Sequence, residues 1–221
     1  MLRAGLLLAA LSLTACTYQA SVPTVDGSSL AAVGARQPGS FAALVQTGGW
    51  AMETQVVGFS CSANTYRADL NPSWDQAMKA AFKTALESVA FVSATLPSPE
   101  LASRGYDAQL GVMQSNASSK LQVSHGFFRR SALAETRLEG ILTIAYPDGT
   151  RQQETLLGQG TARARVAFCS DVGPSIEASS AGAIRDIVQR AAATAKLLLA
   201  QRRAATPSAQ LAPLGAPAPK P

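Results

Sequence analysis

The sequence has few of the residues from which active sites and metal centres are built. Its 221 residues include one histidine and three cysteines, and 6% of them are aromatic. Any nucleophile–histidine arrangement would have to use His125, and no Cys-x-x-Cys spacing indicates a metal site. Gly158 and Gly160 lie inside a strand pattern and lack the lysine and hydroxyl residue of a phosphate-binding loop. We therefore expect neither catalysis nor a cofactor.

Dense blocks of one charge sign are also missing. The chain has 19 Lys and Arg against 14 Asp and Glu, a net charge of +5 that is spread along its length. Such a distribution is not typical of a nucleic-acid-binding patch. A membrane-spanning helix needs about 20 apolar residues, and no stretch of the sequence approaches that length.

What is present is a short apolar segment that ends in a cysteine. Arg3 precedes apolar residues 4–13, and small residues lead into Cys16. A positive start, a short apolar centre and a small-residue cleavage site are typical of a secretory signal peptide. The string Leu13-Thr14-Ala15-Cys16 resembles the lipobox of bacterial lipoproteins. A plain signal peptide with a coincidental cysteine is the alternative.

The lipobox resemblance implies removal of residues 1–15 as a signal peptide. It also implies a diacylglycerol on Cys16 and a further acyl group, such as palmitate, on the freed amine. Two or more acyl chains make a stable anchor. In such lipoproteins an aspartate after the cysteine causes retention at the inner membrane, and Thr17 stands there instead. We therefore expect an outer-membrane protein that faces the periplasm.

Composition divides the remaining chain into three parts. Residues 16–39 are rich in small residues and read as a flexible tether. Residues 204–221 carry five prolines and one charge, which predicts a disordered Pro/Ala-rich tail. Residues 40–203 between them are long enough for a single domain with its own core.

Two segments of this domain have helical periodicity, residues 71–89 and 174–203, each with a proline near its start. Strands are predicted at 40–46, 53–60, 91–95 and 106–114, with a short helical turn near 100–104. The clearest hairpin pairs 134–146 with 150–166 through Pro147-Asp148-Gly149. Gly158 and Gly160 suggest a bulge in its second strand.

This element order predicts an α+β domain with two layers. Two amphipathic helices would pack on one face of a mixed or antiparallel sheet. The order over roughly 40–203 resembles the small domains of several envelope lipoproteins: YajG-type lipoproteins, the lipopolysaccharide-assembly lipoprotein and curli-secretion lipoproteins. The resemblance has no diagnostic motif and assigns no residue beyond the lipobox cysteine.

With Cys16 assigned to the lipid, Cys61 and Cys169 remain as a pair in a compartment that permits disulfides. Two separate buried thiols are the alternative. We expect a disulfide that joins two neighbouring strand ends beside the last helix.

One segment has the composition of a contact surface. Aromatic and basic residues adjoin between two predicted strands, where they form an exposed tip or place a phenylalanine in the core. The candidate contact residues are His125, Phe127, Phe128, Arg129 and Arg130. Six carboxylates are acid–base candidates in principle, and none has a context that distinguishes it from a surface charge. These are Asp69, Asp75, Asp107, Glu135, Glu139 and Asp171.

Three functions are open to such a sequence. The first is a non-catalytic, lipid-anchored accessory protein that supports an envelope, secretion or transport machine through a protein partner. The second is a carrier of lipid or a small ligand with a pocket between sheet and helices. The third is an enzyme acting on cell wall or glycans, in which His125, Asp69 and Glu139 would matter.

Overall fold

The computed structural model describes residues 17–28, 34–48, 50–57, 61, 64–125 and 130–205. Its strands are β1 (Thr17–Ser21), β2 (Gln37–Gln46), β3 (Ala51–Val57), β4 (Thr65–Asp69), β5 (Leu86–Phe91), β6 (Ala108–His125), β7 (Arg130–Ala145) and β8 (Arg151–Val166). Its helices are α2 (Asn71–Ala85), α3 (Ser98–Ser103) and α4 (Gly173–Ala205), with a short 3-10 helix η1 (Cys169–Val172) before α4.

The strands form one mixed sheet organised around β6. Strand β7 pairs antiparallel with β6 along its length, and β8 pairs antiparallel with β7. The other edge of β6 holds two strands in succession. Strand β2 lies parallel to its first part and β3 parallel to its last part. Strand β5 continues the sheet beyond β2, and β4 and β1 continue it beyond β3. The predicted α+β class and the 134–166 hairpin are confirmed.

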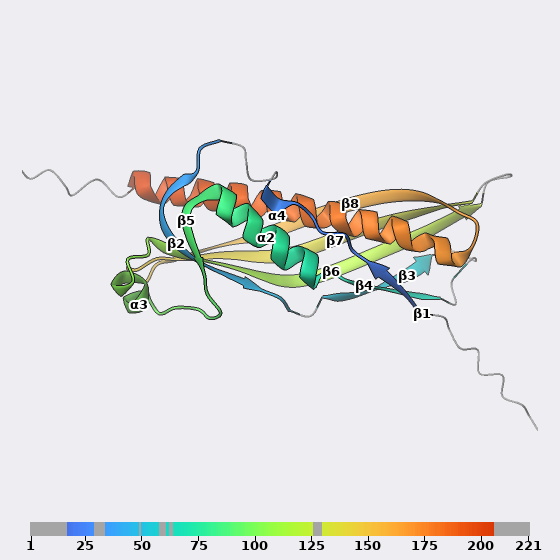
Figure 1. Ribbon diagram of the computed structural model, residues 1–221, viewed down its shortest axis with the longest axis horizontal. Helices are drawn as coiled ribbons and strands as arrows, with labels where there is room; N and C mark the ends of the chain where they lie inside the picture. Colours follow the sequence, from blue (N-terminus) through green and yellow to red (C-terminus); the bar gives the residue numbers. More distant parts are fainter. Residues whose placement is uncertain are drawn as a thin grey trace, which may run out of the picture.

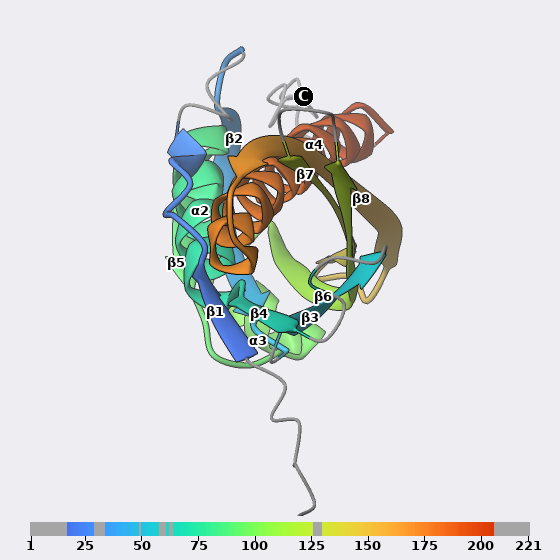
Figure 2. The same ribbon diagram turned by 90° about the vertical axis from the view of Figure 1, so that its right-hand side faces the viewer.

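Helices α2 and α4 lie on one face of the sheet, which curves around α4 (Figures 1 and 2). Helix α2 buries the stripe that its periodicity predicts, with Trp74, Met78 and Phe82 inaccessible to solvent. In the part of the chain that the structure describes, no helix is long and apolar enough to cross a membrane.

Helix α2 ends four residues earlier than predicted. The periodicity extended it to Val89, but Leu86 is already extended, with φ −112° and ψ 149°. Residues 86–91 form β5 instead of the strand predicted at 91–95, because they pair parallel with β2 and place Val89 beside Phe41. Tertiary pairing with β2 therefore overrides the local helical pattern.

The glycines of β8 serve the packing of α4 and make no bulge. The pairing of β7 with β8 is regular through Gly158 and Gly160, and the irregularity lies between Gln114 and Asn116 of β6. A Cβ built on Gly160 would lie 2.0 Å from the Ser179 carbonyl oxygen in α4. The glycines thus let the helix backbone approach the sheet directly, which corrects the prediction of a bulge.

The folded part of the chain begins before the predicted boundary at residue 40. Strand β1 lies within the segment expected to be a tether, and it pairs parallel with β4. The Tyr18 ring stacks on Tyr66 with 5.3 Å between centroids. Ala20 and Val25 are buried, so apolar contacts hold this segment on the domain. The structure therefore contradicts a tether over 17–28. Residues 206–221, most of the predicted tail, lie outside the described residues.

Cys61 and Cys169 form the predicted disulfide, with 5.5 Å between their Cα atoms. The expectation that it joins neighbouring strand ends is wrong. Cys61 follows β3 and Cys169 follows β8, and β6 and β7 lie between these strands in the sheet. The disulfide lies beside the last helix, as expected, and closes the curved sheet across the N-terminal end of α4.

Candidate functional site

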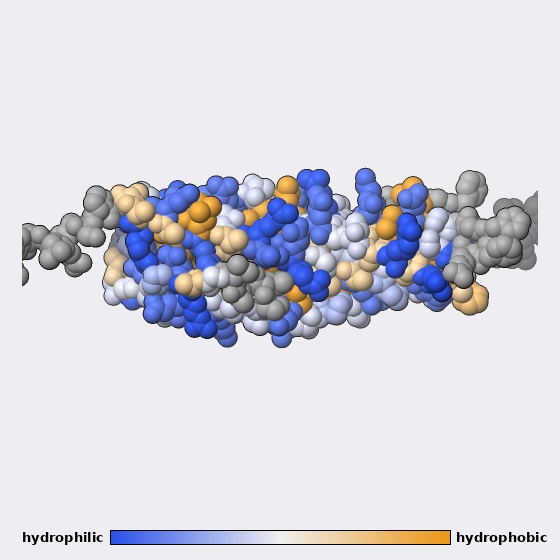
Figure 3. All heavy atoms as spheres, turned by 90° about the horizontal axis from the view of Figure 1, so that it is seen from above, coloured by the Kyte–Doolittle hydropathy of each residue, from blue (hydrophilic) through white to orange (hydrophobic). Residues whose placement is uncertain are grey.

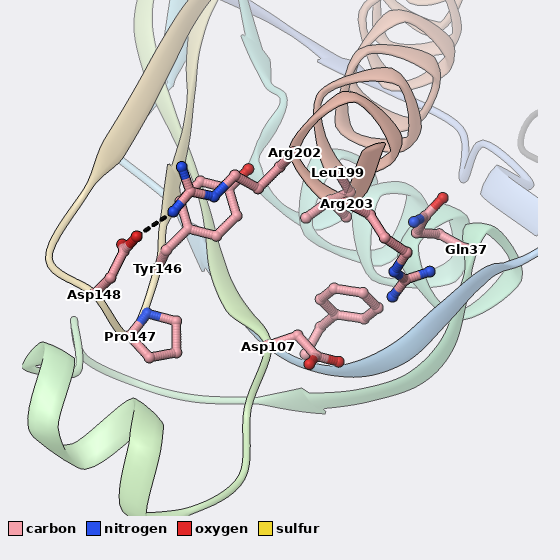
Figure 4. A pocket seen from close by; sticks show the side chains of 9 residues that line it. Gln37, Asp107, Tyr146, Pro147, Asp148, Leu199, Arg202 and Arg203 are labelled. Carbon is pink, nitrogen blue, oxygen red and sulfur yellow. Dashed lines mark hydrogen bonds and ion pairs between the residues drawn. The ribbon is translucent and has the colours of Figure 1, made fainter. Parts of the chain in front are cut away.

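The end of the domain where α4 finishes holds a pocket of about 290 Å³ (Figure 4). The last turns of α4, the β7–β8 turn, the start of β2 and the residue before β6 line it. Its lining residues are Gln37, Phe41, Asp107, Tyr146, Pro147, Asp148, Leu199, Arg202 and Arg203. We call this site the distal pocket.

The apolar floor of the distal pocket comes from residues that also belong to the core. Phe41 is 1% exposed and Leu199 and Tyr146 are each 5% exposed. The Tyr146 hydroxyl donates to Gln152 Oε1 at 2.9 Å. Burial raises the pKa of the Tyr146 phenol, and the neighbouring Arg202 opposes this only in part. The phenol therefore stays neutral and acts as a fixed apolar wall.

One rim of the distal pocket is formed by an arginine and an aspartate that pair with each other. Arg202 forms an ion pair with Asp148, and its guanidinium carbon lies 5.1 Å from the centroid of the Tyr146 ring. Figure 4 shows Arg202 reaching from α4 toward Asp148 in the β7–β8 turn. The charges of this pair offset each other, so the pair fixes the end of α4 to the hairpin.

The other rim is organised around Gly39 at the start of β2. Its φ of +118° is one that L side chains rarely adopt, and a Cβ there would lie 2.2 Å from Asp107 Oδ2. This bare backbone lets Asp107 accept a hydrogen bond from the Ser40 amide at 2.8 Å. Arg203 donates to the Pro38 carbonyl oxygen at 2.7 Å. None of the carboxylates in the described ranges lies within ion-pair distance of Arg203.

The hydrogen bonds of the β7–β8 turn predict how the stability of the fold depends on pH. The Thr150 hydroxyl, and then the Thr150 amide, donate to Asp148 and hold the pKa of its carboxyl below the ordinary 3.8. Because the folded pKa is depressed, this stabilisation is present above 3.8 and is lost as the pH falls through the folded value.

In Thr150→Val the hydroxyl donor is gone, so the pKa of Asp148 should rise toward 3.8, as measured by NMR titration of its carboxyl carbon. Asp171 serves as an internal reference, because the Phe168 and Ala167 amides hold its pKa low at the opposite end of β8. An unchanged Asp148 titration in the variant would show that the Thr150 hydroxyl is not the cause.

The structure describes two of the candidate contact residues named by the sequence. His125 ends β6 and Arg130 begins β7, and the two residues pair across these antiparallel strands. Phe127, Phe128 and Arg129 lie outside the described residues, as does Cys16. His125 and Arg130 lie far from the distal pocket, because β6 ends and β7 begins at the opposite end of the sheet (Figure 1).

The weighed carboxylates are dispersed, and several have structural roles. Asp75 pairs with Lys79 at 2.8 Å, and Glu139 pairs with Arg137 at 3.3 Å. Asp69 accepts the Asn71 amide at 3.0 Å, which ties the end of β4 to α2. Only Asp107 belongs to the distal pocket. Within the described ranges, no group of three or more His, Cys, Asp and Glu side chains could hold a metal ion.

Sequence reasoning did not find the distal pocket. It placed Arg202 and Arg203 at a helix end and Pro147-Asp148-Gly149 in a turn, both correctly, without relating them. Adjacent arginines at a helix terminus were the available signal, but helix-dipole stabilisation explains them equally well. Only the packing of α4 against the β7–β8 turn brings these residues together.

No family model matches this chain, and no curated protein matches it. It is similar to solved structures, among them protein XCC0632 from Xanthomonas campestris, described by the family model DUF330. That likeness has 11% identity and a TM-score of 0.46, and it covers 87% of this chain and 100% of the other.

A neuraminyllactose-binding hemagglutinin homolog from Helicobacter pylori is similar at 10% identity and a TM-score of 0.31, over 79% of this chain and 89% of the other. Lipoprotein GNA1162 from Neisseria meningitidis is similar at 10% identity and a TM-score of 0.24, over 76% and 99%. These TM-scores are low, and the likenesses carry no argument about what this chain does.

Proposed function

We propose that this chain is a lipid-anchored, non-catalytic accessory protein of the bacterial cell envelope, which binds a protein partner through the distal pocket. The lipobox-like string supports the anchor. The observation that carries the proposal is the position of β1, whose first residue, Thr17, directly follows Cys16. A lipid on Cys16 would hold one end of the domain close to the membrane surface.

The distal pocket lies at the other end of the same long axis. Helix α4 begins beside β1, runs to the pocket and has 33 residues (Figure 1). At 1.5 Å per residue it is about 50 Å long. The anchored domain would therefore present the pocket well away from the lipid, where a periplasmic domain or the projecting part of a membrane protein can reach it.

The size of the pocket favours part of a protein over a whole lipid. A volume of 290 Å³ equals roughly ten water molecules at their liquid volume. That suits one or two apolar side chains placed against Phe41 and Leu199. A guanidinium has five donors, so Arg203 can donate to a carboxylate or carbonyl of the partner beside its bond to Pro38.

Contact between α4 and the sheet weighs against a carrier cavity beneath that helix. The carrier hypothesis needs a cavity between the two layers. The approach of α4 to Gly158 and Gly160 brings backbone against backbone there, and Thr136 Oγ1 lies 2.9 Å from Ser179 Oγ in the buried interface. The enzyme alternative is weakened by the dispersal of Asp69, Glu139 and the other carboxylates.

Site-specific crosslinking in the intact cell tests the proposal. A photoreactive residue at Pro147 or Arg203 should give one membrane-protein adduct of the same mass from both positions. Gln189, which is exposed in the middle of α4, is the matched control and should give none. In the Cys16→Ser background the chain should leave the membrane fraction and the adduct should be lost.

The enzyme alternative is tested in the same experiment. His125→Ala, Asp69→Asn and Glu139→Gln should all retain the adduct and the wild-type growth phenotype. A protein without adducts from either rim position, monomeric in isolated membranes, would contradict the proposed partner. Loss of a phenotype in all three variants would favour the enzyme.

A further inference from the structure

Opposite the distal pocket is the end of the domain where β1 begins and β3, β6 and β8 finish; we call it the β1 end (Figure 1). Its elements are joined by direct contacts. Tyr18 stacks on Tyr66, and the Tyr66 hydroxyl donates to the Cys169 carbonyl oxygen at 2.7 Å. The Ser21 amide donates to Glu177 Oε1 in the first turns of α4 at 3.0 Å. The start of β1 and the end of β8 are therefore held together at this end.

The β1 end exposes two large apolar side chains. Phe168, the second residue after β8, is 73% exposed, and Val57, the last residue of β3, is 59% exposed. The Phe168 amide donates to Asp171 Oδ2 at 2.9 Å, so its backbone is held while its ring faces solvent. Exposing an apolar ring to water is unfavourable in free energy, and burying the ring against another apolar phase would recover that free energy.

Basic side chains are exposed at the same end of the sheet. Arg130, Arg163 and Arg165 are exposed, and all three lie in the last paired residues of β7 and β8 at this end. Within the described ranges none of them forms an ion pair.

Three carboxylates of this end have partners within the fold, whereas the exposed Glu135, opposite Thr161, forms no ion pair within the described ranges. Asp171 accepts the Ala167 and Phe168 amides, and Glu177 accepts the Ser21 amide. Glu53 pairs with Arg67 at 2.5 Å. Because the amide donors are neutral, Asp171 and Glu177 keep their negative charge and offset part of the charge of the three arginines.

We propose that the β1 end rests on the surface of an anionic phospholipid membrane. Phe168 and Val57 enter the boundary between headgroups and acyl chains, and the three arginines face lipid phosphates. Apolar side chains combined with Arg are the chemistry of interfacial membrane binding, and guanidinium groups bind phosphate well. This inference rests on the proposed lipidation of Cys16, because that lipid would bring the β1 end to the bilayer.

We expect end-on contact, because Phe168, Val57 and the three arginines are exposed at one end of the domain. On the face seen in Figure 3, apolar residues are scattered among hydrophilic ones and form no broad patch. The domain would stand with α4 pointing away from the bilayer, which also places the distal pocket as the proposed function requires.

The test uses the lipidated full-length mature chain in vesicles of phosphatidylethanolamine and phosphatidylglycerol, with brominated acyl chains as the quencher. Phe168→Trp adds a fluorophore at the β1 end. The native Trp50 and Trp74 are 7% and 0% exposed and give a constant background. Leu197→Trp is the matched control, because Leu197 is 57% exposed on the distal half of α4.

We expect brominated lipid to quench and blue-shift the added emission of Phe168→Trp and to leave Leu197→Trp unchanged. Arg163→Gln with Arg165→Gln should weaken the quenching in anionic vesicles, and vesicles of phosphatidylcholine alone should show less of it. Phe168→Trp emission that brominated lipid does not quench would overturn the inference. Equal quenching of Phe168→Trp and Leu197→Trp would mean that the domain lies flat on the membrane, and would overturn it as well. Shielding of Phe168→Trp from acrylamide only in native membranes would assign this end to a protein partner and overturn it too.

Failure of the anchor itself gives a different result. An unlipidated chain would not float with vesicles, and its intact mass would lack the acyl groups. A chain that is lipidated and floats, but whose Phe168→Trp emission is indifferent to brominated lipid, would retain the proposed anchor and overturn only the contact of the β1 end.

Discussion

Gly160→Ala is expected to destabilise the protein by roughly 3 kcal/mol, at the upper end of the range for overpacked cores. The new Cβ would lie 2.0 Å from the Ser179 carbonyl oxygen and 2.5 Å from the Ala183 amide nitrogen. Both are backbone atoms of α4, so no side-chain rotation relieves the contact. Helix and sheet would have to separate along an interface that also buries Ile187 and Thr136. Urea unfolding followed by circular dichroism measures the change.

Gly111→Ala is the matched control for this substitution. Gly111 is also a strand glycine, but a Cβ there would meet its nearest neighbours, atoms of Thr143, at 3.9 Å, an ordinary contact distance. The control should retain the unfolding midpoint of the wild type. Equal stability of both variants would mean that α4 does not press on β8 as the structure places it.

Removal of the disulfide is the second change with a large expected effect. Cys61 and Cys169 are 108 residues apart in sequence. Loop-closure entropy for that separation predicts a loss of about 4 to 5 kcal/mol on cleavage, an upper value because strain and residual unfolded-state structure reduce it. The bridge links the segment after β3 to η1, so its loss should loosen the β1 end first. The double variant Cys61→Ser/Cys169→Ser avoids a leftover reactive thiol.

Two measurements check this prediction. The free energy of unfolding of the double variant should fall below that of the oxidised wild type and match that of the reduced wild type. Hydrogen exchange should rise first in β1, β4 and the start of α4, while the amides around the distal pocket stay protected. An unfolding free energy unchanged by reduction would show that the cross-link does not constrain the unfolded chain.

Local patterns were sufficient for the elements whose partners are adjacent in sequence. The hairpin of β7 and β8 followed from alternation and a strong turn signal, and α4 followed from its stripe of apolar residues. The α+β class followed from the order of elements. In each case the deciding contacts lie within one element or between sequence neighbours.

The predictions failed where distant segments decide the structure. Residues 17–28 looked like a tether because five residues of β1 give too short a pattern, and their stability comes from β4 and α2 across the fold. Leu86 and Val89 fit a helical stripe, yet pairing with β2 draws them into a strand. The glycines of β8 indicated a bulge, because nothing in the sequence shows that helix α4 lies on them.

By itself, then, the sequence determined the class of the domain, its two main helices, its long hairpin and the pair of cysteines free to bond. The class, the helices and the hairpin follow from local sequence patterns. The cysteine pair follows because the third cysteine is assigned to the lipid. Only the tertiary structure decided that β1 begins directly after Cys16, that the arginines of α4 meet the β7–β8 turn, and that Phe168 and Val57 are exposed at one end. These features depend on which surfaces pack together, and packing is set by the whole fold.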